Sequence, residues 1–268
     1  MNARQTILSG QVFLWEYAGG FWYGIDGDNV LKVDDTGVVD ASGGVPDFFR
    51  DSDDVDSIRA SLSADPLLRR AMERYPGLRI TQQDFAQCAI SFVVSANSNI
   101  PRIRRSLREI CRRFGDMVRF DGMEFRTFPP PERIAGLDIP DIRACGTGYR
   151  AAYVRDAARA ILEGAGPDGQ PYPAARRRLC EMPGVGSKVA DCILLFSCGY
   201  LEAFPLDRWL VRTIHDTYGI GSGKAPHSHA AYDAIHDMVV KRLGPYAGYA
   251  QQYLFKMARD TADKPLRW

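Results

Sequence analysis

The sequence predicts an α+β fold, in which an N-terminal antiparallel β-sheet module packs on an all-helical body. Aromatic and β-branched residues dominate the start of the chain, where VFLWEY and FWYGID flank the turn AGG, and NVLKVDD and TGVVDA follow. Runs of this kind, bounded by Gly, Asn and Asp, are typical of an antiparallel meander. After Ser52 the apolar residues recur at helical spacing instead. No repeat or low-complexity linker separates the two parts, so we expect a module over 1–78 packed on a helical body over 79–268.

The helical body begins with SIRASLSADPLLRRAMERY, in which Ile58, Leu62, Leu67 and Met72 have helical spacing. The same pattern continues, so that one helix follows another to the end of the chain. Helices are expected at 55–62, 65–74, 83–96, 100–114, 130–135, 139–144, 149–163, 173–181, 187–198, 207–218, 228–242 and 246–262.

Composition excludes several classes of protein. The chain has 268 residues, of which 46% are hydrophobic and 25% charged, so it can bury a substantial core. No stretch approaches the roughly 18 consecutive apolar residues of a membrane span. The N-terminal MNARQTILSGQ is too short and too polar for a signal peptide. We therefore expect a soluble protein that carries no targeting signal and does not bind membranes.

The cysteines are scattered along the chain and form no CxxC pair. They are Cys88, Cys111, Cys145, Cys180, Cys192 and Cys198. A zinc or iron–sulfur site usually needs clustered thiols, so the spacing favours reduced, mostly buried cysteines. We expect no metal site and no other cofactor.

The net charge of +1 conceals two segments of opposite sign. Ten aspartates lie within 26–56, where the only basic residues are Lys32 and Arg50, and six arginines lie within 102–113, where the only acid is Glu109. A protein that turns one face to a polyanion can be sorted in this way. An arginine run is also what an ordinary solvated helix face presents, so the charge pattern alone leaves both interpretations open.

The segment LCEMPGVGSKVADC carries the most specific functional signal. A helix is expected to end before Pro183, Gly184 and Gly186 allow tight turns, and Ser187 is expected to cap a new helix. Such a loop presents backbone N–H groups at a helix N-terminus, so Gly184, Val185 and Gly186 are candidates for gripping a nucleic-acid phosphate. An ordinary corner between two helices that happens to be rich in glycine has the same pattern.

Lys188 and Asp207 are the candidate reactive pair. Lys188 lies in the first turn of the second helix, where the positive helix end disfavours its charge and favours the neutral, nucleophilic amine. A lysine in such a position is also commonly a plain surface residue. Asp207 stands between AFPL and the helical run RWLVRTIHDTY, so we expect it to cap that helix. A carboxylate fixed in this way is also well placed to hold a lysine or to stabilise a sugar cation.

LCEMPGVGSKVADCILLF, followed by AFPLD, resembles the helix-hairpin-helix, Gly/Pro-then-Asp superfamily of DNA glycosylases, and most of all its 8-oxoguanine glycosylases of the Ogg type. The likeness covers nearly the whole chain. SGQVFLW resembles the family's N-terminal strand signature, DPLLRRAMERYPGLRITQQDF and SFVVSANSNIPRIRRSLREICRRFG its central helices, GTGYRAAYV the segment before the hairpin, and GPYAGYAQQYLF its pocket helix. The resemblance implies a helix-hairpin-helix motif at about 173–198 within the helical body.

The resemblance implies a bifunctional DNA glycosylase and AP lyase that removes 8-oxoguanine, preferably opposite cytosine, in base excision repair. Lys188 matches the Schiff-base lysine, which attacks C1′ of the damaged nucleotide and displaces the base before β-elimination nicks the strand. Asp207 matches the catalytic aspartate, which stabilises positive charge on the sugar and assists proton transfers. The expected partner is double-stranded DNA that contains oxidised guanine. We expect a monomer in the cytoplasm, associated with the nucleoid if the source is prokaryotic.

The base-pocket residues follow from the same resemblance, because a base must leave the helical stack before it can be reached. Gln251 and Phe255, four apart on a predicted helix, match the reader of the Watson–Crick edge and the aromatic lid. Cys192 matches the opposite wall, and Gly10 matches the glycine whose carbonyl accepts the N7 hydrogen of 8-oxoguanine. Without the resemblance, Phe255 is ordinary core, Gln251 a surface amide and Gly10 a glycine at the entry to a strand.

Four further residues match those that fill the gap in the duplex and read the base opposite the lesion: Asn97, Arg102, Tyr149 and Arg150. Tyr149 matches the wedge in the stack. Two arginines on the acceptors of cytosine favour oxidised guanine opposite cytosine. By composition alone, both arginines are general phosphate contacts.

The chain departs from the family at two points. Ser98 interrupts what is often a run of three asparagines, and Trp209 stands where a histidine is common, two residues after the catalytic aspartate. The phosphate contact and the pocket dynamics at Trp209 are therefore in doubt, whereas Lys188 and Asp207 are untouched.

Two alternatives stay open. One is a glycosylase of the same superfamily for another damaged base. Lys188 argues against its monofunctional alkyl-purine enzymes, and the lack of a cysteine after Cys198 argues against the branches with a C-terminal four-cysteine cluster. The other is a non-catalytic helix-hairpin-helix DNA-binding protein, which would need no aspartate at the distance of Asp207.

Overall fold

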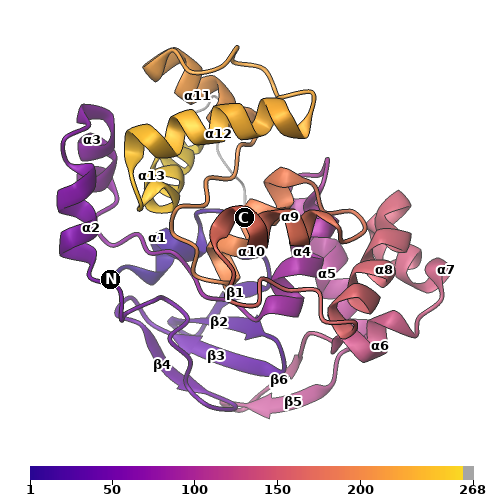
Figure 1. The fold of residues 1–268 in the computed structure, drawn as a ribbon. Coiled ribbons are helices and arrows are strands. Elements are labelled where there is room, and N and C mark those ends of the chain that lie inside the picture. The colour runs from indigo at the N-terminus through magenta and orange to yellow at the C-terminus, as the bar shows by residue number, and fades with distance from the viewer. Residues whose placement is uncertain (262–268) are drawn as a thin grey trace.

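The protein consists of an antiparallel sheet at one side of the molecule and a helical body that covers it (Figure 1). The structure is a computed structural model that describes residues 1–261. Four strands form the sheet in the order β1-β2-β3-β4, which confirms the predicted meander. Their bounds are β1 (Trp15–Ala18), β2 (Phe21–Asp26), β3 (Asn29–Val33) and β4 (Val38–Ala41).

The sheet is fixed to the rest of the molecule by one buried indole. Trp15 pairs with Gly24 across β1 and β2, and a β-carbon at Gly24 would lie 2.2 Å from the Trp15 ring, so only glycine leaves room for it. The same ring packs on Phe48 and Phe49, with centroids 5.3 and 6.2 Å away. These rings belong to a small hydrophobic core against the sheet, which is distinct from the large core of the helical body.

The helices of the body fall close to where helical periodicity places them. They are α2 (Val55–Leu62), α3 (Pro66–Arg74), α4 (Phe85–Ser95), α5 (Ile100–Phe114), α6 (Pro131–Ala135), α7 (Ile139–Ile142), α8 (Ala151–Leu162), α9 (Tyr172–Cys180), α10 (Ser187–Ser197), α11 (Arg208–Tyr218), α12 (His229–Leu243) and α13 (Ala247–Asp260). The expected end of the last helix, at 262, lies outside the described residues.

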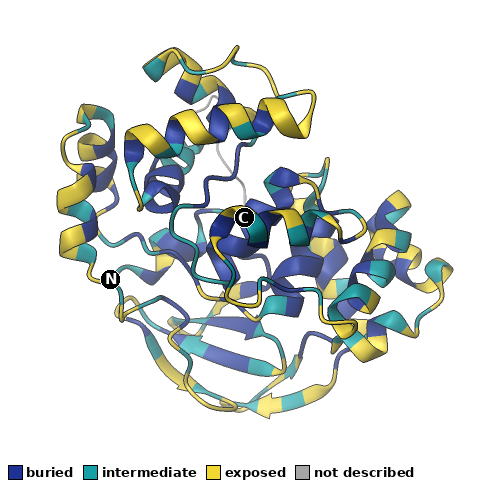
Figure 2. Cartoon of the chain, viewed as in Figure 1, coloured by how far each residue is buried: buried dark blue, intermediate teal, exposed yellow. Residues whose placement is uncertain are grey.

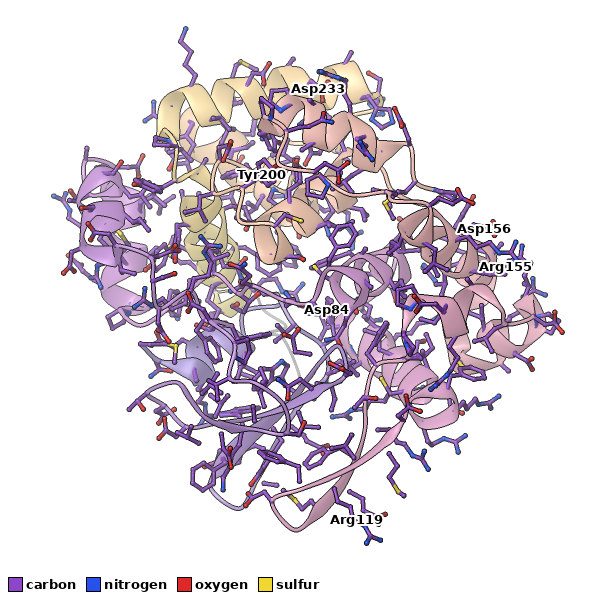
Figure 3. The ribbon with its side chains drawn as sticks, turned by 60° about the horizontal axis from the view of Figure 1, so that its bottom comes forward. Asp84, Arg119, Arg155, Asp156, Tyr200 and Asp233 are labelled. Atoms are coloured by element: carbon purple, nitrogen blue, oxygen red, sulfur yellow. The ribbon has the colours of Figure 1, made fainter. Side chains whose placement is uncertain are left out.

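Two elements escape the sequence prediction. The short helix α1 (Ala3–Ile7) is capped by Asn2, and the hairpin of β5 (Met117–Phe120) and β6 (Met123–Arg126) interrupts the helical body. This hairpin reaches back to the N-terminal sheet, where Asp121 pairs with Lys32 at 2.7 Å. Arg119 projects from its outer side (Figure 3). The strands have only four residues each, but the Asp121-Gly122 turn between them, with φ of 50° and 73°, was an available hairpin signal.

The segment between α7 and α8 differs from the two continuous helices expected at 139–144 and 149–163. The α-helix ends at Ile142 and is followed by a π-helical turn over Arg143–Thr147 and a 3₁₀ turn over Gly148–Arg150. Gly146 and Gly148 have φ of 83° and 63°, values that no α-helix accommodates, so they break the run. The break places Tyr149 at a bend instead of on a helix face.

The middle of the helical body is α4 and α10 (Figure 2). They pack against each other, and α13 packs against α11 and α3. Every residue of α10 is buried except Lys188. None of the six cysteines forms a disulfide, and four of them are buried. Within residues 1–261, no helix is both long enough and apolar enough to cross a lipid bilayer.

Candidate active site

The hairpin between α9 and α10 has the geometry that its glycines predict. Gly184 has φ of 82°, and a β-carbon there would lie 2.7 Å from the β-carbon of Tyr153, so the turn requires glycine. Val185 is buried and anchors the loop. Gly186 is the N-cap of α10 and is followed by a first turn without a side-chain cap. The first N–H groups of α10 therefore remain available to an anion.

Ser187 does not cap α10, contrary to the sequence prediction. It is the first residue inside the helix, and its buried hydroxyl hydrogen-bonds Nδ1 of His229 on α12 at 2.7 Å. The glycine before it adopts the extended N-cap conformation instead. The serine thus connects the hairpin to α12 and does not compete for the N–H groups of the helix end.

Lys188 is the one residue of α10 that is half-buried instead of fully buried. Its Nζ lies 5.2 Å from the centroid of the Phe92 ring on α4. Burial opposes the charge on the amine, but Cys192 and Asp207 beside it outweigh burial, so the pKa of Lys188 lies above its ordinary value. The helix end favours the neutral amine and these neighbours favour the ammonium, so the protonation state of Lys188 expected from the sequence stays a prediction.

Asp207 caps α11 as expected. Its Oδ1 accepts hydrogen bonds from the backbone N–H groups of Trp209, at 3.0 Å, and Leu210, at 2.8 Å. Burial raises the pKa of Asp207 above its ordinary value, while these hydrogen bonds and the charges of Lys188 and Arg259 oppose the rise. The structure therefore brings Lys188 and Asp207 into each other's electrostatic field from two different helices.

The residues of the predicted base pocket, namely Gly10, Cys192, Gln251 and Phe255, converge on the same region. Gly10 has φ of 88°, and a β-carbon there would lie 3.0 Å from the Phe255 ring. Cys192 is buried one turn after Lys188. Gln251 is also buried, which excludes the surface amide, and its Nε2 lies 3.5 Å from the carbonyl oxygen of Pro205. We call these four residues the base pocket.

The amide oxygen of Gln251 has an unusual environment. Its Oε1 is buried and has no hydrogen-bond partner among residues 1–261. A buried acceptor without a donor costs about 1–3 kcal/mol, so proteins seldom leave one without a reason. A ligand that offers an N–H group at this point would satisfy it.

Three of the residues predicted to contact the opposite strand are exposed and adjacent. Asn97 has φ of 49°, and its Nδ2 donates to the hydroxyl of Tyr149 at 3.2 Å. Tyr149 is 59% exposed, as a wedge must be. Arg102 lies nearby, since its Nη2 would be 3.8 Å from a β-carbon on Gly148. Together with Arg150 we call them the gap cluster.

Arg150 differs from its neighbours in the gap cluster because it is buried. Its guanidinium donates to the carbonyl oxygens of Ala96, Asn97 and Thr147. The same group stacks on the Tyr149 ring at 4.5 Å. In this state Arg150 holds the backbone that presents Asn97 and Tyr149, and it is neither a solvated surface contact nor open to a base.

The arginine run on α5 is not a single open basic face. Arg112 and Arg113 both pair with Glu109, at 2.7 and 2.5 Å. Arg104 donates to the carbonyl of Trp15 at 2.7 Å, and Arg108 lies 3.7 Å from Glu16. Much of the run thus connects α5 to itself and to the sheet, and Arg102 at its start belongs to the gap cluster.

A buried polar network that was not predicted from the sequence lies behind the hairpin. Asp191 is fully buried on α10 and accepts hydrogen bonds at 2.6 Å from the hydroxyls of both Tyr172 and Tyr232. Tyr172 also bonds Nε2 of His236 at 2.6 Å. Arg176 pairs with Asp233 on α12 (Figure 3). An aspartate in an otherwise apolar helix was the available signal in the sequence. The network holds α9, α10 and α12 together next to the start of α10, where Lys188 lies.

A second missed residue is Arg259 on α13. Its guanidinium lies 5.2 Å from the Trp209 ring and 5.8 Å from the Phe255 ring. The spacing of 251, 255 and 259 along one helix was the available signal. Metal binding is a separate question. Within residues 1–261, no group of three or more His, Cys, Asp or Glu side chains is placed to hold a metal ion.

Comparison with known proteins identifies the family of this arrangement. The HhH-GPD superfamily of base excision DNA repair proteins matches residues 90–233. A probable N-glycosylase/DNA lyase of Methanothermobacter thermautotrophicus is 34% identical over 74% of this chain and 68% of its own length. The N-glycosylase/DNA lyase OGG1 of Arabidopsis thaliana is 29% identical over 97% of this chain and 78% of its own length.

Solved structures agree over nearly the whole molecule. A structure of MBOgg1 in complex with a low-affinity DNA ligand has a TM-score of 0.86 and 31% identity, covering 97% of this chain and 92% of that one. The 8-oxoguanine glycosylase/lyase of Clostridium acetobutylicum, in complex with double-stranded DNA containing cytosine opposite 8-oxoguanine, has a TM-score of 0.85 and 28% identity with the same coverage. The chain therefore belongs to the HhH-GPD superfamily of base excision DNA repair proteins and, within it, to the Ogg-type N-glycosylase/DNA lyases.

Proposed function

We propose that this DNA repair glycosylase excises 8-oxoguanine from duplex DNA, preferably opposite cytosine, and then cleaves the strand at the resulting abasic site. The observation that carries the proposal is that Lys188 and Asp207 lie in each other's electrostatic field, while the buried amide of Gln251, whose oxygen is unpartnered, lies 3.5 Å from the carbonyl oxygen of Pro205, two residues before Asp207. An amine nucleophile, a carboxylate and a hydrogen-bond acceptor for a purine edge are the three groups that this reaction needs. The names of the related proteins support the same assignment.

The chemistry begins with Lys188. After its ammonium gives up a proton to water, the Nζ lone pair bonds C1′ while the glycosidic bond breaks, and the base leaves with the bonding electrons and takes a proton from water. Asp207, held at the α11 N-terminus, stabilises the positive charge that develops on the sugar. The sugar then opens to an imine on Lys188. Loss of a proton from C2′ and expulsion of the 3′ phosphate complete the β-elimination, and hydrolysis of the imine restores the amine.

Recognition of the lesion is assigned to the base pocket. Gly10 would accept the N7 hydrogen of 8-oxoguanine at its carbonyl, a contact that guanine cannot make because its N7 carries a lone pair. One such hydrogen bond, against an unsatisfied acceptor, is worth about 1–3 kcal/mol. Gln251 would bind the Watson–Crick edge, and Phe255 and Cys192 would enclose the ring from its two faces.

Preference for cytosine is assigned to Arg102 and Arg150, which can donate to its ring acceptors. Arg102 is exposed and ready for this contact. Arg150 must first release the three backbone carbonyls that it binds in this structure. The gap cluster therefore rearranges on binding DNA, while the N–H groups of Gly184 and Gly186 hold a backbone phosphate. The N–H of Val185, the third predicted contact, already donates to the carbonyl oxygen of Met182 at 3.1 Å.

Borohydride trapping tests the proposal directly. Reduction of the imine should link the protein covalently to a duplex with 8-oxoguanine opposite cytosine. Lys188→Gln should abolish the linkage. The affinity for the duplex, measured by gel shift, should stay within about threefold of the wild type, because the hairpin and the gap cluster are unchanged. Lys241→Gln, on the exposed side of α12, is the matched control and should trap like the wild type. Trapping by the Lys188 variant at the wild-type rate would refute the assignment.

A panel of duplexes tests the substrate. The covalent complex should form faster with 8-oxoguanine opposite cytosine than opposite adenine, and undamaged guanine should give none. Equal rates opposite both bases would remove the roles assigned to Arg102 and Arg150. Efficient trapping only on another damaged base would replace 8-oxoguanine as the substrate and would leave Lys188 as the nucleophile.

A further inference from the structure

Arg259 occupies a position that the reaction described above does not explain. It follows Gln251 and Phe255 at intervals of four on α13, so the three side chains share the helix face that borders the base pocket. Its guanidinium lies over two rings, Phe255 on its own helix and Trp209 on α11. Trp209 is also the residue whose N–H group donates to Asp207. The cation therefore bridges the pocket lid and the N-terminus of the helix that Asp207 caps.

The guanidinium is incompletely paired where it lies. Its Nε is buried and lacks a hydrogen-bond partner among residues 1–261. Burial lowers the pKa of Arg259, and the nearby carboxylates of Asp207 and Asp260 oppose this shift. Asp260 itself is engaged by Tyr75 and Lys256. An unpaired buried nitrogen on a cation is costly, and stacking on two rings repays only part of that cost.

The charges around Asp207 come from two helices. Lys188 and Cys192 face it from α10, Arg259 faces it from α13, and its own helix contributes two backbone N–H groups. Lys188 must become neutral before it can attack C1′, and at that moment Asp207 loses one of its two cationic neighbours. The Arg259 guanidinium stays charged throughout, because arginine does not give up its proton in proteins.

We propose that Arg259 is a positioning residue of the active site: held between Trp209 and Phe255, it is the permanent positive charge that keeps Asp207 ionised while Lys188 reacts as a neutral amine. The inference rests on the proposed function, in which Asp207 must be a carboxylate to stabilise the sugar cation. It also gives a purpose to Trp209, the tryptophan that departs from the family pattern, because its ring forms one side of the stack that holds the guanidinium.

Single-turnover base excision between pH 5.5 and 8.5 tests this inference with three variants. Arg259→Gln removes the charge and keeps a planar polar group, whereas Arg259→Lys keeps the charge. Arg70→Gln is the matched control, because Arg70 lines the surface pocket that Trp209 also borders but is not among the groups that act on Asp207. The acidic limb of the wild-type profile reports the two groups that must lose a proton before the reaction, Asp207 and Lys188, and Arg259 is among the charges that act on Asp207.

The charge-loss variant should move the acidic limb upward by about one pH unit, which makes it about tenfold slower on that limb and nearly unchanged on the plateau. Arg259→Lys and Arg70→Gln should keep the wild-type limb to within about twofold in rate. Equal losses in both Arg259 variants at every pH, or an unmoved limb in Arg259→Gln, would overturn the inference. Thermal unfolding of each variant at pH 7 shows whether the fold is retained.

A duplex with a preformed abasic site distinguishes an effect of Arg259 that acts through Phe255 from one that acts through Asp207. It contains no damaged base, so a role exercised through Phe255 alone would leave borohydride trapping on this duplex unchanged. A role exercised through Asp207 should slow trapping by Arg259→Gln at acid pH on both duplexes, and an effect confined to the base-containing duplex would overturn it. Failure of the wild type to trap at all would instead refute the proposed function.

Discussion

The base pocket and the gap cluster differ in the state of their polar groups. In the base pocket, Gln251 is buried with an unsatisfied amide oxygen, and its Nε2 lies 3.5 Å from the carbonyl oxygen of Pro205, two residues before Asp207. In the gap cluster the buried member, Arg150, has already bound three backbone carbonyls, and its partners Arg102 and Tyr149 are exposed. One region therefore leaves its binding groups unpaired before substrate arrives, and the other uses them to hold its own backbone.

This difference shows where the protein places stability and where it places function. Polar groups that wait for substrate cost folding free energy and return it on binding, so their removal should cost activity and little stability. Polar groups that are satisfied internally contribute to the fold first. Their removal should cost stability even when their second role is recognition. Each variant below separates these two outcomes in one of the two regions.

The largest effect is expected for Asp207→Asn. Asparagine caps a helix about as well as aspartate, and its amide oxygen can still accept from Trp209 and Leu210. The negative charge that stabilises the sugar cation is lost, so the excision rate should fall about 10²–10⁴-fold. Single-turnover kinetics measure the rate and thermal unfolding the stability. A large drop in melting temperature would mean that the charge, and not only the cap, holds the fold.

The next largest effect is on stability, in the gap cluster. Arg150→Ala leaves three backbone carbonyls without their donor, so the free energy of unfolding should fall by about 2–4 kcal/mol. Arg102→Ala, its exposed neighbour, should change stability by less than about 0.5 kcal/mol and reduce only the preference for cytosine. Urea denaturation compares the two. Equal losses of stability in the two variants would contradict the proposed difference between Arg150, which is hydrogen-bonded within the protein, and the exposed Arg102.

These variants also mark the limit of sequence-based prediction. The α10–α11 pair and the spacing of Gln251 and Phe255 are local patterns, and local periodicity placed their helices to within a few residues. The partners of Arg150, Ser187 and Asp191 lie 53, 42 and 41 residues away, and no local pattern encodes such contacts. Lys188 differs from these residues, because the neighbours that raise its pKa are Cys192, one turn along its own helix, and Asp207, which the sequence analysis already paired with it.

The strands missed at 117–126 illustrate a different limit. Each strand has only four residues, although β6 alternates between apolar and polar side chains, and the hairpin is held by contacts with a distant sheet, such as the packing of Phe125 on Tyr23 at 5.5 Å. Tertiary contacts of this kind override weak propensity. Conversely, the glycines at 146 and 148 were visible in the sequence, and their positive φ values explain why the expected helices stop there.

A smaller effect on activity is expected for Gln251→Met in the base pocket. Methionine has a similar shape and no amide, so the buried unpaired oxygen disappears and the free energy of unfolding should rise by about 1 kcal/mol. Excision of 8-oxoguanine should fall about 10–100-fold, because one or two hydrogen bonds to the base are lost. Trapping on a preformed abasic site should be unchanged. A loss of stability would show that Gln251 is already satisfied in the free protein.

The smallest effect is expected outside both regions, where the sheet meets α4. Burial raises the pKa of Asp26 to about 7, with Asp84 and Asp28 adding to the shift and the backbone N–H of Asp84 opposing it. Asp84, labelled near the centre of the view in Figure 3, is exposed and caps α4, the helix that carries Phe92 next to Lys188. A pH effect on this junction should therefore act on the fold and not on the reactive pair.

The sign of that pH effect follows from the direction of the shift. Since the folded state raises the pKa of Asp26 above its ordinary 3.8, it favours the protonated carboxyl, and this contribution is complete below about pH 4 and lost as the pH rises through about 7. Asp26→Asn stays neutral and keeps an oxygen for the Asp84 N–H. It should gain about 1–2 kcal/mol over the wild type at pH 8 and nothing at pH 4. Urea denaturation at the two pH values measures the gain, and an equal difference at both would show that the carboxyl does not titrate in this range.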